Sequence, residues 1–309
     1  MAASDKPQDM VLAQSQRLLR RVAFEMNRAI KSPQAEHIHD LRVSIRRFVQ
    51  SLGVFQGVFH GKEVRKIHRR LKKLFSSAGE VRDCDIALKL LSKSHADNAN
   101  ILAAKLKIRR KECERKLSGA ARAWMERKTS VKWRQALEAA ALKNQGEIER
   151  IGGGVPDPEA LSHMARRFFT VGHKAADGKN PEDLHEFRIT AKKFRYTLEL
   201  FVSFYSASFN GILEALKVIQ GLLGDINDCE TARQIISKHQ GFKNLETWLT
   251  KRENKKIREF RQQWAERFGD DQTEKKWIGQ LSQPLAPPPA RKPVGRMSVS
   301  VESARTGTA

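Results

Sequence analysis

A ten-residue motif occurs twice in this chain, at corresponding places in its two halves. HDLRVSIRRF spans 39–48 and HEFRITAKKF spans 185–194, an offset of 146 residues. Matched positions carry a histidine, an acid, an arginine, a β-branched residue and a basic pair. A second pair of segments, GEVRDCD at 79–85 and GDINDCE at 224–230, follows at an offset of 145. Four segments in the same order predict an internal duplication, so the fold should consist of two similar halves.

Each copy of the first motif has the periodicity of an amphipathic helix. At about 100° per residue, His39, Arg42 and Arg46 fall within about 60° of each other. The opposite side of both copies is apolar, with Leu41, Ile45, Phe48 and Leu52 in the first and Phe187, Ala191, Phe194 and Leu198 in the second. The polar face of each helix is therefore almost purely cationic.

A stripe of one charge sign has two interpretations. Charged helix residues usually form an ordinary solvated surface. Such a surface mixes signs and gains from i,i+4 ion pairs, whereas Arg42, Arg46 and Arg47 repel one another. Because the same residue types recur in both halves, we favour a second interpretation, in which a bound anion relieves the repulsion.

The overall charge extends this expectation to a polyanion. The chain has 58 Lys and Arg against 35 Asp and Glu, a formal net charge of +23. This bias favours nucleic acid, an acidic membrane surface or inorganic polyphosphate as the partner, without choosing among them. No apolar run approaches roughly 18 residues and the N-terminus lacks a hydrophobic signal core, so we expect a cytoplasmic protein without membrane insertion.

The three cysteines favour a reducing compartment. Cys84 and Cys229 occupy equivalent places in the two repeats, which indicates packing rather than a disulfide or a metal site. The sequence shows no metal cluster, P-loop or pairing of a nucleophile with a base. We therefore expect no enzyme activity, no catalytic residue, no metal and no cofactor.

Apolar periodicity predicts helices almost throughout, and hence an all-α fold. We expect helices at about 10–30, 39–59, 62–78, 84–94, 96–127, 131–145, 158–176, 185–205, 209–223 and 242–268, the last of which should end the fold. Gly79 is expected to end one helix and Asp83 to cap the next. The first repeat is placed at 1–150, the second at 151–281 after a glycine-rich linker at 152–158, and a proline-rich disordered tail at 282–309.

The paired H-x-x-R-[V/I]-x-x-[R/K]-[R/K] segments, each followed by G-x-x-[R/N]-D-C-[D/E], resemble the CHAD domain, the conserved-histidine α-helical domain. The resemblance covers roughly residues 10–270. It implies two antiparallel four-helix bundles related by a pseudo-two-fold axis, with the histidine helices facing across a basic groove or pore. It also implies binding of inorganic polyphosphate, often at polyphosphate granules. Val49 departs from the family pattern, which usually has a basic residue there, as Arg195 is in the second copy.

Cationic side chains one helical turn apart, about 5.4 Å, suit a linear chain of phosphates. We expect His39 and His185 to share one basic cavity, and we interpret Arg82–Asp83 and Asn227–Asp228 as helix caps and ties. The predicted polyphosphate ligands are His39, Arg42, Arg46, Arg47, Arg65, Arg69, Lys72, Arg20 and Arg21 in the first repeat, and His185, Arg188, Lys192, Lys193, Arg195, Lys217, Arg166 and Arg167 in the second.

Two other functions fit parts of this pattern. The segments at 39–42 and 185–188 match the phospho-acceptor box of two-component histidine kinases, but the proline of that box and a glycine-rich ATP-binding lobe are both missing. Nonspecific binding of DNA or RNA by counterion release needs only positive charge, so it stays the alternative function. It is also compatible with polyphosphate binding, as a secondary activity of the same protein. The sequence specifies neither an oligomeric state nor a preferred polyphosphate length.

Overall fold

The computed structural model describes residues 7–94, 99–150, 156–207 and 209–283. These ranges contain eleven α-helices, one short 3-10 helix and no strand, so the all-α prediction is confirmed. The predicted tail lies outside the described residues from 284 onward, and so do residues 152–155 of the predicted linker. None of the described helices has the length and apolar character needed to cross a membrane.

The helices follow one another with short connections. The bounds in the first half are α1 Pro7–Lys31, α2 Ala35–Val54, α3 Lys62–Ser94, α4 Ala99–Glu126, α5 Thr129–Lys143 and α6 Gln145–Arg150. Those in the second half are α7 Pro158–Asp177, α8 Pro181–Leu200, the 3-10 helix η2 Val202–Phe204, α9 Phe209–Ile236, α10 Lys243–Phe268 and α11 Asp271–Leu281. Helix α11 was not expected. It begins where the Asp270 side chain accepts a hydrogen bond from the backbone N–H of Gln272, and it buries Trp277 and Leu281.

Two predicted helix ends are wrong, because α3 runs unbroken through Gly79 and α9 through Gly224. A Cβ atom at position 79 would lie 2.6 Å from Nη1 of Arg42. The glycine therefore makes room for an arginine from α2 and does not end the helix. Asp83 and Asp228 consequently lie inside helices, so they are not caps.

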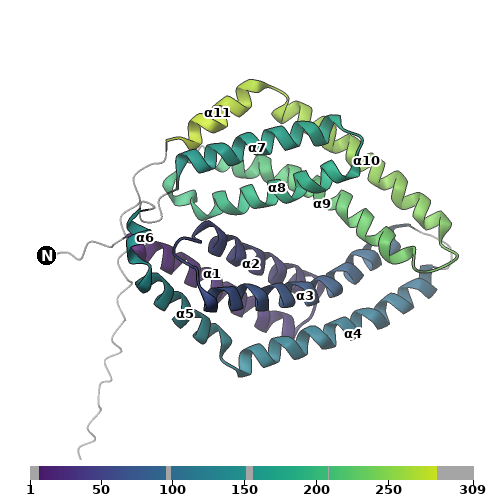
Figure 1. Ribbon diagram of the computed structural model, residues 1–309. Coiled ribbons are helices and arrows are strands. Elements are labelled where there is room, and N and C mark those ends of the chain that lie inside the picture. The colour runs from purple at the N-terminus through teal and green to yellow at the C-terminus, as the bar shows by residue number, and fades with distance from the viewer. Residues whose placement is uncertain (1–6, 95–98, 151–155, 208, 284–309) are drawn as a thin grey trace, which may run out of the picture.

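The two halves pack against each other through their central helices (Figure 1). Neighbours along the chain pack in the order α1–α2–α3–α4 in one half and α7–α8–α9–α10 in the other, while α2 contacts α8 and α3 contacts α9. Side chains tie α2 to α8 directly: Gln50 Nε2 donates to Thr197 Oγ1 at 2.9 Å, and Arg47 Nε donates to Glu199 Oε2 at 2.8 Å.

The buried apolar side chains form two clusters. The larger one runs through both halves and contains an aromatic group on α7, α8, α10 and α11 that includes Phe168, Phe194, Trp264 and Trp277. The smaller one joins the far ends of α3, α4, α9 and α10. All five tryptophans pack in helix interfaces, and Cys84, Cys113 and Cys229 are free and buried.

Gly172 allows α7 to approach α10 closely, because a Cβ atom there would overlap the ring of Trp264. That ring packs against Phe168, Phe187 and Phe268 and has little room to move. We expect Gly172→Ala to lower the free energy of unfolding by about 2 kcal/mol, measured by urea denaturation. Gly119→Ala on α4 is the control, since no atom lies within 4 Å of the added methyl group, and it should be neutral or stabilising. Equal losses in both variants would contradict this account.

Candidate anion-binding site

A cavity of about 440 Å³ lies where α2 and α3 meet α8 and α9. Eight lysine and arginine side chains line it against three aspartates, and we call it the basic cavity. Its charged lining residues are Arg42 and Arg46 of α2, Arg82, Asp83 and Lys89 of α3, Arg188, Lys192 and Arg195 of α8, and Lys217, Asp225 and Asp228 of α9. His39, Val43, Ile86, Tyr196, Gln220, Gly221, Gly224 and Asn227 complete the lining.

The two arginines from α2 are held in place by neighbouring groups. Arg42 Nη1 donates to the Phe75 carbonyl at 2.8 Å, and its guanidinium lies 4.1 Å from the centre of the Phe75 ring. Arg46 lies 5.2 Å from the same ring and donates to the Tyr196 hydroxyl at 3.2 Å. Arg42 therefore has a structural role in joining α2 to α3, while Arg46 keeps most of its donors for a ligand.

The second copy of the motif is less constrained. The position matching Phe75 is Gln220, whose amide donates to the Ala191 carbonyl at 2.7 Å. Arg188 Nε is buried and has no hydrogen-bond partner among the described residues. Within the same ranges, neither Arg188 nor Lys192 forms an ion pair with a carboxylate. No ion pair with a carboxylate of the described residues compensates the charge of either cation.

Burial and mutual repulsion disfavour the charged forms of these side chains. The pKa of Lys192 falls to about 7, mainly because the ammonium is buried and next because Arg46 and Arg188 lie nearby. Burial and Arg46 likewise lower the pKa of Arg188, and they lower that of Arg42 to about 10. An anion in the cavity would reverse these shifts, so the site favours an anion electrostatically.

The histidine and the acids of the cavity are also perturbed by burial. Burial, followed by the charge of Arg82, lowers the pKa of His39, so its imidazole tends toward the neutral form. Burial raises the pKa of Asp83 and of Asp228, while the surrounding cations oppose that rise. The aspartates therefore offset only part of the positive charge.

Some lining residues were missed or misassigned by the sequence analysis. Arg82, Asp83 and Asp228 were interpreted as caps and ties, and Lys89 and Asp225 were not considered. The missed signal was the apolar period of α3, which continues past Gly79 and shows that the helix does not stop. Because α3 is uninterrupted, Arg82 and Asp83 line the same cavity as Arg42.

The structure brings seven of the seventeen predicted ligands into the basic cavity: His39, Arg42, Arg46, Arg188, Lys192, Arg195 and Lys217. Three others make ion pairs elsewhere, Arg47 with Glu199, Arg21 with Glu25 and Arg167 with Glu186. Six others are exposed outside this cavity: Arg20, Arg65, Arg69, Lys72, Arg166 and Lys193. Arg20 borders a small separate depression. Helical periodicity groups residues along one helix, but it does not specify which face meets the other half.

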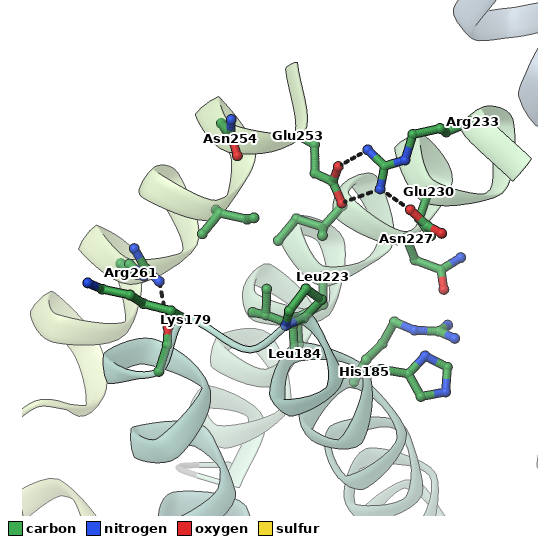
Figure 2. A pocket seen from close by; sticks show the side chains of 15 residues that line it. Lys179, Leu184, His185, Leu223, Asn227, Glu230, Arg233, Glu253, Asn254 and Arg261 are labelled. Carbon is green, nitrogen blue, oxygen red and sulfur yellow. Dashed lines mark hydrogen bonds and ion pairs between the residues drawn. The ribbon is translucent and has the colours of Figure 1, made fainter. Parts of the chain in front are cut away.

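His185 was expected to share the cavity of His39, and this prediction is wrong. It lines a neighbouring pocket of about 470 Å³ (Figure 2), where Leu184 and Leu223 are apolar lining residues. Helix α10 lines that pocket through Glu253, Asn254, Ile257 and Arg261, none of which lines the basic cavity. Figure 2 also shows Arg233 held by Glu230 and Glu253. Arg188 and Asn227 line both pockets.

Comparison with known proteins agrees with the sequence motifs. The CHAD domain family matches residues 13–237. Two uncharacterised proteins from strains of Mycobacterium tuberculosis are each 26% identical over 222 residues, which cover 67% of this chain and 41% of theirs. The chain thus spans about two fifths of the length of these curated relatives.

Two solved structures are similar in fold. The CHAD domain from the plant Ricinus communis has a TM-score of 0.60 at 20% identity, covering 92% of this chain and 95% of that one. PptA from Streptomyces chartreusis has a TM-score of 0.52 at 14% identity, covering 90% of this chain and 100% of that one. At these identities the two structures support the shared helical fold alone.

Proposed function

Because this chain belongs to the CHAD domain family, we propose that its basic cavity binds inorganic polyphosphate. The observation that carries the proposal is the convergence of Arg46 from one half with Arg188 and Lys192 from the other on one cavity, where no carboxylate of the described residues forms an ion pair with them. Arginine donors bind phosphate oxygens by charge-assisted hydrogen bonds. A linear chain of phosphates can satisfy cations from both halves at once.

The shape of the site supports polyphosphate over double-stranded nucleic acid. The basic cavity has a volume of about 440 Å³ and is bounded by four helices. A narrow, flexible chain can enter such a space, whereas a duplex about 20 Å across, consistent with its groove widths, cannot. Nucleic acid would instead meet exposed cations such as Arg65 and Arg69 on α3. Nonspecific nucleic-acid binding is therefore a second candidate function at a different surface.

Several finer features belong to the same proposal. We propose that residues 1–150 and 151–281 are products of an internal duplication, built as two antiparallel four-helix bundles. The successive packing of α1–α4 and of α7–α10 supports this organisation. We further propose a binding role without catalysis, exercised in the cytoplasm and at polyphosphate granules.

A competition experiment tests the choice of polyanion. Labelled long-chain polyphosphate bound to the full chain is displaced either by unlabelled polyphosphate or by duplex DNA at equal phosphate concentration and physiological salt. We expect polyphosphate to compete at least about tenfold better, because two or more buried charge-assisted contacts are open to it alone. Equal competition by DNA would assign binding to the outer surface and reject the basic cavity as the polyphosphate site.

A further inference from the structure

A separate depression of about 290 Å³ lies where α3, α4 and α5 meet. We call it the α3–α5 depression. It shares no lining residue with the basic cavity. Its lining is apolar on the inside and cationic at the rim: Leu74, Ala120, Ala123 and Trp124 are apolar, Ser77 and Thr129 carry hydroxyls, and Arg70, Lys73 and Arg127 are basic.

The three rim cations are uncompensated. All are exposed, and within the described ranges none forms an ion pair, nor does an acidic residue line the depression. By contrast, Arg110 in the first half and Arg233 in the second half each form ion pairs with two carboxylates. A rim of like charges above an apolar floor differs from an ordinary solvated surface, which mixes charge signs.

The indole of Trp124 provides a second, independent feature. The side chain is 7% exposed and packs edge-on against Trp133, with 5.8 Å between the ring centroids. Its Nε1–H is buried and finds no hydrogen-bond acceptor among the described residues. Because almost none of this atom is accessible, a ligand in the depression meets the indole ring and not its N–H, so Trp124 contributes apolar surface to the floor.

We propose that the α3–α5 depression binds the phosphate headgroup of an anionic phospholipid at a membrane surface. Arg70, Lys73 and Arg127 would contact the phosphate above the ring of Trp124. The lining side chains Leu74, Ala120 and Ala123 offer apolar surface beneath these cations. An aliphatic lipid chain can use these apolar groups, whereas inorganic phosphate and a nucleic-acid backbone cannot.

Cosedimentation of the full chain with vesicles tests this site. The vesicles are phosphatidylcholine alone or phosphatidylcholine doped with phosphatidic acid, and we expect binding to the doped vesicles only. Near an anionic leaflet each cation contributes roughly a fivefold gain in affinity, so Arg70→Gln with Lys73→Gln should weaken binding about 25-fold. Arg127→Gln alone should weaken binding about fivefold.

The matched control is Lys255→Gln with Arg258→Gln on α10, across the molecule in Figure 1, where both side chains are exposed. It removes the same charge and should change vesicle affinity less than about twofold, because surface charges beyond about 8 Å are screened. Polyphosphate affinity should stay unchanged in the depression variants, so this test is independent of the basic cavity. A water-soluble short-chain phosphatidic acid should displace the vesicles while inorganic phosphate at the same concentration should not.

Three results would overturn the proposal. The first is an equal loss of affinity in the α10 control, which would mean that only net charge matters. The second is displacement by inorganic phosphate as effective as by the short-chain lipid, which would mean that the apolar lining plays no part. The third is no binding to doped vesicles.

Discussion

Replacing Arg46, Arg188 and Lys192 together with glutamine should weaken polyphosphate binding by about a thousandfold. Each of the three side chains lines the basic cavity, and Arg188 Nε is buried without a partner among the described residues. A charge-assisted hydrogen bond contributes roughly 1.5 kcal/mol or more, so three lost contacts correspond to about three decades in affinity. Fluorescence polarisation with long-chain polyphosphate at physiological salt measures this effect. Arg42 is left intact because it bonds the Phe75 carbonyl and fills the space above Gly79.

The control variant removes the same charge from outer helices, through glutamine at Lys107, Lys111 and Lys255. All three are exposed, and none forms an ion pair within the described part of the chain. They contribute long-range attraction, which salt screens over about 8 Å, so the affinity should fall only a few-fold. The cavity variant should also be as stable as the parent or more so, since it loses like-charge repulsion. Similar affinities for the two folded variants would reject the basic cavity as the site.

Polyphosphate affinity should fall by up to about tenfold between pH 7 and pH 9 because of Lys192. The pKa of this residue in the free protein is about 7, set first by burial and then by Arg46 and Arg188. A bound polyanion stabilises the ammonium and raises that pKa, so binding above pH 7 requires uptake of one proton. Below pH 7 Lys192 is already charged and the affinity is constant. Above pH 7 it declines about tenfold per unit until the pKa of the complex is reached. Isothermal titration across this range, in buffers of different ionisation enthalpy, measures both the affinity and the proton uptake.

Lys192→Arg separates this effect from the titration of other groups. The guanidinium keeps its charge, so the variant should bind with little change in affinity over the same range. The lowered pKa of Lys192 also makes the stability of the free protein depend on pH. The folded state holds fewer protons than the unfolded state between pH 7 and the ordinary lysine pKa of 10.5, so the free energy of unfolding should rise with pH in that window. A parent and a Lys192→Arg variant with the same steep pH dependence would show that Lys192 is not the titrating group.

Local features of the sequence predicted the helices well where start and stop signals were strong. Pro158 follows the cap residue Asp157, which accepts hydrogen bonds from the backbone N–H groups of Glu159 and Ala160, and α7 begins there as expected. The basic stripe on α2 and its counterpart on α8 also meet at one cavity, because each stripe lies opposite an apolar face that is buried in the core. Glycine was the misleading signal, since Gly79 serves the approach of Arg42 in mid-helix.

The sequence by itself determined an all-α chain, its repeated motifs and the cationic faces of α2 and α8, because charge pattern and helical period are local properties. Only the tertiary structure decided how equivalent residues differ. Arg42 bonds a carbonyl of α3, whereas Gln220 stands at the position of Phe75 in the second half and Arg188 Nε finds no partner among the described residues. His39 lines the basic cavity, but His185 lines a neighbouring pocket that α10 also lines. These differences depend on contacts between residues far apart in sequence, and a repeated motif does not encode its neighbours.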